Sequence, residues 1–154
     1  MAYIESSQGG AEPEGCVFCS LLQRGDPDGE RILYRGERAF VTLAKYPYNP
    51  GHLLVLPNRH TADLEDITAE EAGEIHASLQ RCMRALRAVA TPHGFNVGLN
   101  LGRVAGAGIP EHLHWHLVPR WGGDTNFMPV IGGTRVLPEL LSETYERLRP
   151  EFEA

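Results

Sequence analysis

The chain has 154 residues, of which 42% are hydrophobic, and a formal net charge of −6 from 20 acidic and 14 basic residues. This length suits one domain with a single core and is short for two ordinary domains. The acidic balance argues against binding to a long nucleic acid, although a few aimed donors can still hold a small anion. With no apolar run long enough for a membrane span and no evident secretory signal, we expect a cytoplasmic protein.

The first 15 residues are rich in glycine, serine and glutamate and contain few apolar groups. Such a composition cannot offset the entropy cost of ordering, so we expect residues 1–15 to be a mobile tail ahead of a single domain, residues 16–154. Ordered structure is predicted to begin near Cys16 with a short helical turn through Leu21 and Leu22.

Three strands are predicted next, at residues 31–34, 39–43 and 52–56, because β-branched and aromatic runs alternate there with turn residues. Thr68 and Glu71 have the spacing of a capping box, and apolar residues then recur at helical intervals. We therefore predict one long amphipathic helix that ends at about residue 90.

Alternation with period two predicts a fourth strand at residues 95–101 and a fifth at residues 112–118, and helical spacing returns at residues 137–148. The expected fold class is α+β: an antiparallel sheet of about five strands, with the long helix on one face and a C-terminal helix.

Three histidines, His112, His114 and His116, alternate with the apolar residues Leu113 and Trp115. On a strand they would share one face, where imidazole can act as a nucleophile, a proton carrier or a metal ligand. Two alternatives are a solvated strand that carries histidines by chance and a cupin-like metal cage. The cage would need further ligands, and Glu111, the one acidic residue close by, should face away.

A glycine-rich loop at residues 102–110 directly precedes these histidines. Glycines let backbone N–H groups approach phosphate oxygens closely. The loop lacks the Gly-Lys-Ser/Thr ending of a Walker A motif and no helix follows it, so a plain connecting loop is the alternative.

The segment 112–118 resembles the signature of the histidine triad family, and segment 51–57 followed by His60 resembles the family's second-strand signature. The resemblance extends from Cys16 to about Phe127. Further segments look like the branch that contains the bacterial diadenosine tetraphosphate phosphorylases. These segments are residues 46–52, 93–100 and 119–124. The resemblance implies a histidine-triad-like fold.

The same resemblance implies that His114 is the nucleophile and forms a covalent nucleotidyl intermediate that phosphate or water resolves. His116 would contact the phosphate and help to protonate the leaving group, and His52 would support the site from the neighbouring strand. Mg²⁺ would accompany the polyphosphate. The implied phosphate-binding residues are Asn100, Gly106, Ala107 and Gly108.

The Cys-x-x-Cys spacing near the N-terminus suits either a metal or a redox pair. By resemblance to zinc-carrying members of the family, a closed structural zinc site is implied at Cys16, Cys19, His60 and His112. Resemblance also implies an apolar wall for the nucleoside, although ordinary core packing explains the same residues. These residues are Val17, Phe18, Leu21 and Leu43.

The implied activity is cleavage of dinucleoside polyphosphates at the α-phosphate by a homodimeric enzyme. The alternatives are a nucleoside phosphoramidate hydrolase of the same family and a zinc-stabilised nucleotide-binding module without turnover. The sequence departs from the family pattern at Ala44, where an Asp or Asn commonly binds ribose. It departs again at Ala107 and Gly108, where the phosphorylase branch usually carries Gly and then Ser.

Overall fold

A computed structural model of the protein describes residues 15–24, 31–125 and 139–153. The predicted tail falls almost wholly outside these residues, as do Phe127 and the first two positions of the predicted C-terminal helix. That residues 16–154 form one domain stays a prediction. The principal elements are α2 (Val17–Arg24), β1 (Ile32–Arg35), β2 (Ala39–Leu43), β3 (Leu53–Pro57), α3 (Ala69–Ala90), β4 (Gly94–Gly98), β5 (Trp115–Arg120) and α5 (Leu141–Glu153).

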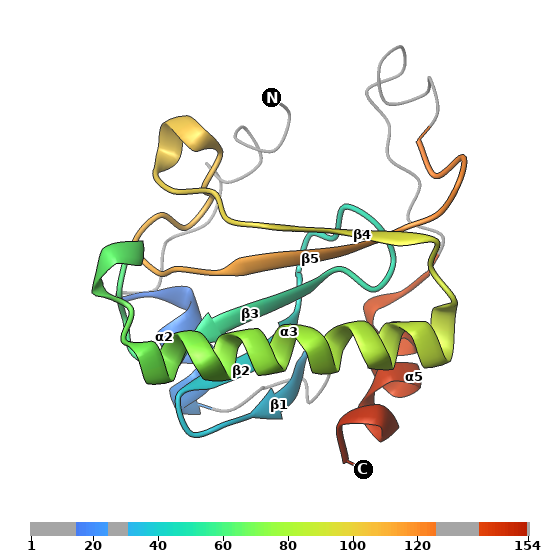
Figure 1. Ribbon diagram of the computed structural model, residues 1–154, viewed down its shortest axis with the longest axis horizontal. Coiled ribbons are helices and arrows are strands. Elements are labelled where there is room, and N and C mark those ends of the chain that lie inside the picture. Colours follow the sequence, from blue (N-terminus) through green and yellow to red (C-terminus); the bar gives the residue numbers. More distant parts are fainter. Residues whose placement is uncertain (1–14, 25–30, 126–138, 154) are drawn as a thin grey trace.

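The five strands form one sheet in the order β1-β2-β3-β5-β4, and every neighbouring pair is antiparallel (Figure 1). Every residue of β2 and β3 is buried. Strands buried on both faces consist mainly of apolar residues, as β2 and β3 do here. The predicted α+β fold, with about five antiparallel strands, one long helix and a C-terminal helix, is confirmed.

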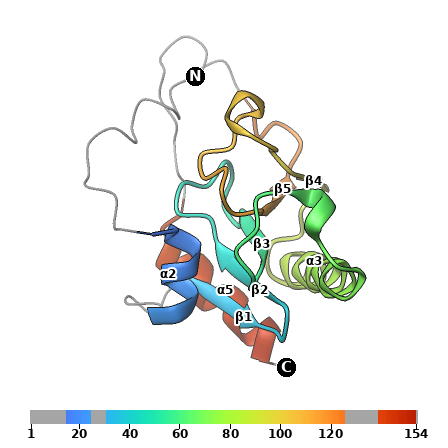
Figure 2. The ribbon, with the colours of Figure 1, turned by 90° about the vertical axis from the view of Figure 1, so that its left-hand side faces the viewer.

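Helices α2 and α3 lie on opposite sides of the sheet (Figure 2). On the α3 side, Val41, Leu53 and Leu117 from the strands pack with Leu86 of α3 and Leu148 of α5. On the α2 side, the neighbouring strand positions form a second cluster with the helix. It comprises Phe18, Leu21, Phe40, Ala44, Leu54 and Leu56. His116 pairs in register with Leu54, so the His116 side chain lies on the α2 side of the sheet.

Helix α3 begins with the predicted capping box. The Glu71 N–H donates to the Thr68 hydroxyl (3.1 Å), and the Thr68 N–H donates to the Glu71 carboxylate (2.9 Å). That carboxylate also accepts two bonds from Arg59, both 2.9 Å long. The hydrogen bonds from Arg59 come first among the causes that lower the pKa of Glu71 to about 2. None of the helices in the described ranges has the length and apolar character needed to cross a membrane.

We expect Glu71→Gln to reduce the free energy of unfolding by about 1–2 kcal/mol at neutral pH, because the partly exposed Arg59 loses a charged partner. The folded-state pKa of Glu71 lies below its unfolded value, so the stabilisation is complete above about pH 4.5 and is lost as pH falls toward 2. Urea unfolding of both proteins between about pH 7 and pH 3 checks this. A stability difference that does not shrink in acid would contradict it.

Several predicted boundaries were wrong, most clearly those of the fifth strand, the fourth strand and the C-terminal helix. The fifth strand begins at Trp115 rather than at residue 112, because the preceding Leu113 N–H donates to the Thr61 carbonyl instead of joining the ladder. Strand β4 ends at Gly98 rather than at residue 101, because Gly98 already pairs with His116, next to the start of β5. Helix α5 starts at Leu141 and continues past Pro150 to Glu153.

Candidate active site and metal centre

His114 lies just before β5 with only 8% of its surface exposed. Its Nδ1 lies 2.8 Å from the His112 carbonyl oxygen, so Nδ1–H donates and the lone pair is on Nε2. Burial lowers the pKa of His114 more than the bond to that carbonyl raises it. The ring is therefore neutral near pH 7, and its Nε2 can act as a nucleophile.

His52 and His116 form a bonded pair, with His52 Nε2 3.0 Å from His116 Nδ1. The Tyr48 N–H donates to His52 Nδ1 at 3.1 Å, so neutral His52 carries its proton on Nε2 and donates it to His116. Neutral His116 must then carry its own proton on Nε2. Burial lowers the pKa of His116 to about 4, with a smaller contribution from the neighbouring His114, and this keeps His116 neutral.

The Nε2 of His116 is buried and has no hydrogen-bond partner among the described residues. A buried N–H without a partner is costly, and such groups often mark a functional site. The rings of His114 and His116 lie 5.0 Å apart, centroid to centroid. A neutral ring with a lone pair on Nε2 therefore lies next to a ring whose buried Nε2–H has no partner among the described residues.

The four predicted metal ligands are brought together. One ligand atom from each of Cys16, Cys19, His60 and His112 lies within 4.8 Å of the others. The Nδ1 of His112 is 3.4 Å from the Cys16 sulfur and 3.6 Å from the Cys19 sulfur, while the Nδ1 of His60 is 3.4 Å from the Cys19 sulfur. This Cys2His2 group could hold a metal ion.

The tautomer of His112 suits metal binding, whereas the thiol of Cys19 would need a cation to lose its proton. His112 Nε2–H donates to the Pro57 carbonyl at 2.9 Å, which leaves the lone pair on the Nδ1 that faces the thiols. Burial and the adjacent Cys16 raise the pKa of Cys19 to about 11. A cation at this position would supply the positive charge that both thiolates need.

The Cys2His2 group and His114 share structural supports. The carbonyl of His112, a candidate ligand, accepts a hydrogen bond from His114 Nδ1–H. Phe18, between the two cysteines on α2, packs with its ring centroid 5.6 Å from that of His112 and 5.2 Å from that of His114. Movement of His112 would therefore move His114 as well.

The glycine-rich loop uses part of its predicted phosphate-binding backbone internally. The Gly106 N–H donates to Arg103 (3.0 Å), and the Ala107 N–H donates to Gly102 (3.2 Å). The Asn100 amide nitrogen lies 3.4 Å from the Gly106 carbonyl, which brings this side chain against the loop, whereas Gly108 is exposed. Two of the three N–H groups predicted to bind phosphate are thus engaged within the loop.

The residues predicted to line the nucleoside pocket are not all brought together. Phe18 and Leu21 belong to the α2-side cluster, and Val17 is 43% exposed on the same helix. Leu43 lies in the core on the α3 side, while its neighbour Ala44 is on the α2 side. The sequence could have placed Leu43 on the α3 side, because residues two apart on a strand share a face and Leu43 is two residues from Val41.

Sequence reasoning missed Tyr48, which it treated as part of a turn. The Tyr48 ring centroid is 4.7 Å from that of His52 and 5.8 Å from that of His116. Proximity to His52 in the sequence was the only available signal.

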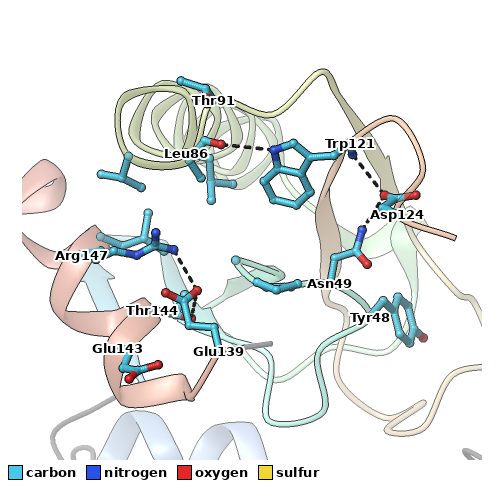
Figure 3. A pocket seen from close by; sticks show the side chains of 15 residues that line it. Tyr48, Asn49, Leu86, Thr91, Trp121, Asp124, Glu139, Glu143, Thr144 and Arg147 are labelled. Atoms are coloured by element: carbon cyan, nitrogen blue, oxygen red, sulfur yellow. Dashed lines mark hydrogen bonds and ion pairs between the residues drawn. The ribbon is translucent and has the colours of Figure 1, made fainter. Parts of the chain in front are cut away.

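A cavity of about 610 Å³ opens beside this turn, between α3 and α5 (Figure 3). Tyr48, Asn49 and Trp121 are among the residues that line it, whereas His112, His114 and His116 are not. The Trp121 indole donates to the Ala90 carbonyl at the end of α3, so this ring packs against the helix. Tyr48 therefore contacts the histidines and also borders this cavity.

Comparison with known proteins places this geometry in context. A family model described as the HIT domain matches residues 28–123. AP-4-A phosphorylase from Mycobacterium tuberculosis is 47% identical over 147 residues, which span 96% of this chain and 73% of the relative. Bis(5'-nucleosyl)-tetraphosphatase (asymmetrical) from Schizosaccharomyces pombe is 34% identical over 100 residues, 64% of this chain and 53% of that protein.

Solved structures agree with the sequence comparisons. A zinc-bound histidine triad family protein from Mycobacterium smegmatis superposes with a TM-score of 0.73 at 30% identity, over 90% of this chain and 94% of that one. The match of the family model covers more than half of the chain, and the M. tuberculosis relative is well above 30% identical over most of its length. The chain therefore belongs to the histidine triad (HIT) family.

Proposed function

We propose that the protein cleaves dinucleoside polyphosphates, with diadenosine tetraphosphate as the representative substrate, through attack of His114 on an α-phosphate. The observation that carries this proposal is the buried, neutral His114, whose Nδ1–H bond to the His112 carbonyl leaves Nε2 as the nucleophile. The names of the relatives support the substrate class, since one is a phosphorylase and another a tetraphosphatase of this type.

In the first step, the lone pair of His114 Nε2 forms a bond to the α-phosphorus and the bond to the bridging oxygen breaks. The departing nucleotide keeps that electron pair and leaves as a phosphate anion. The His116 Nε2–H, which has no partner among the described residues, donates a hydrogen bond to the departing oxygen and keeps its proton. The His52 Nε2–H remains bonded to His116 Nδ1 and holds that ring in place. The product on the enzyme is a nucleotidyl-imidazole.

In the second step, phosphate or water attacks the α-phosphorus, the P–N bond breaks and His114 regains its lone pair. When water is the acceptor, its proton leaves to solvent or to the phosphate product, and His114 and His116 are then in their starting states. We assign to Asn100 the contact with a nonbridging oxygen, because its amide already lies against the loop. Gly106 and Ala107 would have to give up internal bonds to help.

We further propose that the Cys2His2 group holds Zn²⁺. Two thiolates and two imidazoles form a closed tetrahedral set, so the ion would supply rigidity rather than an open catalytic position. The zinc-bound histidine triad structure supports this identity. The described residues contain no second such group of candidate ligands, so the expected Mg²⁺ gains no support here. The cytoplasmic location also stays a prediction.

Product analysis tests the proposed function directly. Diadenosine tetraphosphate incubated with the protein and phosphate should give ADP plus ATP, whereas water as the acceptor should give AMP plus ATP. Parallel reactions with and without phosphate separate the two outcomes. If the protein left diadenosine tetraphosphate intact but hydrolysed AMP-amine conjugates, the substrate proposal would be wrong; nucleotide binding without product from either compound would favour a binding module.

A homodimer is the proposed assembly. Strand β4 is at one edge of the sheet, and its Phe95 packs on the α3-side core, whereas Val97 on the same face is 44% exposed. A second copy could cover this apolar edge. We expect sedimentation to show a dimer that Val97→Lys dissociates and that Val104→Lys, at a fully exposed position beyond the strand, leaves intact. A monomeric wild type would contradict the proposal.

A further inference from the structure

We propose that Tyr48 is a positioning residue that fixes the orientation and tautomer of the His52–His116 pair, and that a polar network centred on Asp124 holds Tyr48 in place. The inference rests on the proposed function for its catalytic consequence. Its structural part, the tautomer of two histidines, can be measured without turnover.

Tyr48 contacts the histidine pair in two independent ways. Its backbone N–H donates to His52 Nδ1, which makes Nε2 the protonated nitrogen that faces His116. Its ring also packs against both imidazoles, at an interplanar angle of 14° with His116 and 32° with His52. If either imidazole rotated by half a turn, a carbon would take the place of the bonded nitrogen and the hydrogen bond between His52 and His116 would be lost. The Tyr48 ring packs on both imidazoles and so opposes that rotation.

The backbone around Tyr48 is fixed from both sides. The His52 N–H donates to the Asn49 carbonyl at 3.1 Å, which closes a turn around Gly51. Gly51 has a φ of 80°, and a Cβ there would lie 2.8 Å from a methyl carbon of Leu86, so only glycine fits. The turn that presents the Tyr48 N–H is thus held against both His52 and α3.

Asn49 connects this turn to the end of β5. Its side-chain NH₂ group donates to the Asp124 carboxylate at 2.8 Å (Figure 3). The same group also donates to the Pro119 carbonyl at 2.9 Å. Arg120 grips the same carboxylate with two bonds of 2.6 and 2.8 Å. In Figure 3 the Asn49 side chain points toward Asp124, while Tyr48 extends away on the other side of the turn.

The network therefore runs from Arg120 through Asp124 and Asn49 to Tyr48 and then to His52. Every link is a hydrogen bond, a ring contact or adjacency in the chain. Asp124 accepts bonds from Arg120, Asn49 and the Trp121 N–H, and the bond from Arg120 is first among the causes that hold its pKa below the usual range. Asp124 is thus charged near neutral pH and can anchor the turn firmly.

The test compares Tyr48→Leu, Tyr48→Phe and Asn49→Ala in the full-length, zinc-loaded protein. The imidazole ¹⁵N signals of His52 and His116 report the tautomers directly, and steady-state kinetics on diadenosine tetraphosphate separates kcat from KM. We expect Tyr48→Leu to mix the tautomers and to lower kcat about 10-fold or more with little change in KM. Both Tyr48 variants keep the backbone N–H, but only Tyr48→Phe keeps the ring, so Tyr48→Phe should behave as wild type.

Asn49→Ala removes the anchor and leaves the Tyr48 ring, so it should shift the same signals and lower kcat in the same direction. It also keeps the proposal testable if Tyr48→Leu does not fold. Tyr46→Leu, at an exposed position in the same turn, is the matched control and should change neither readout.

Wild-type tautomers and kcat in Tyr48→Leu would overturn the inference, and so would a rise in KM alone, which would mean that the ring contacts substrate. If the wild type turned over no dinucleoside polyphosphate, the proposed function would fail, yet the ¹⁵N signals would still decide whether Tyr48 positions the pair.

Discussion

Replacing His114 with alanine is expected to lower kcat/KM on diadenosine tetraphosphate by roughly 10⁴-fold or more, because no other group would form the bond to phosphorus. The variant should stay folded and keep its metal. The substitution leaves the His112 carbonyl without the bond from Nδ1, at a cost of about 1–3 kcal/mol, which a domain of this size can tolerate. Initial rates, circular dichroism and metal content measure the three parts.

The matched control is His76→Ala, which removes an exposed imidazole from α3 and should leave turnover unchanged. Rapid quenching of the wild type with excess enzyme should also trap a chain heavier by one nucleotidyl group, and the adduct should be absent from His114→Ala. Turnover near the wild-type level in His114→Ala would rule out the covalent mechanism.

Much of the fold could be predicted because the signals are local. The capping box at Thr68 and Glu71 is set by spacing alone, and it forms as expected. The run of apolar and β-branched residues at 39–43 predicts a strand, and β2 has those bounds. Local rules identify such elements because the interactions that form them connect residues that are close in the sequence.

The histidine segment shows where local rules stop. Alternation predicts a strand from residue 112, yet the imidazoles of His112 and His114 bond to the carbonyls of Pro57 and of His112 itself, before the strand begins. These side-chain bonds to the backbone take the place of ladder pairing. The histidines still meet at one site, although His114 is far less exposed than a residue on a solvated strand face would be.

The position of Tyr48 could not be derived from pattern at all. Its anchor joins Asn49 to Asp124, 75 residues apart in the chain, and its ring contacts a histidine 68 residues away. Nothing in the spacing of these residues predicts that they meet. Likewise, glycines in the loop before His112 suggest exposed N–H groups, whereas two of those groups bond within the loop.

Loss of the metal is expected to have the second largest effect. We expect Cys16→Ser to bind less than one Zn²⁺ per chain and to lower Tm by on the order of 10 °C. Metal binding stabilises only the folded state, by several kcal/mol, and each kcal/mol corresponds to about 2–4 °C in a chain of this length. Metal content by atomic emission and thermal unfolding with and without chelator provide the measurements.

Activity should fall along with stability, even though the ion has no open position for substrate. Without it, the pKa of Cys19 stays near 11, the group loses the charge that holds four ligands together, and His112 loses the constraint on its ring. Because the His112 carbonyl orients His114 and Phe18 packs against both rings, a looser His112 allows the proposed nucleophile His114 to turn away from phosphorus.

The control is Cys82→Ala, which removes a buried thiol packed in the α3-side core and should retain one Zn²⁺ and full activity at a small cost in Tm. Cys16→Ser protein that retained its Tm and its turnover would show that the Cys2His2 group has no structural role.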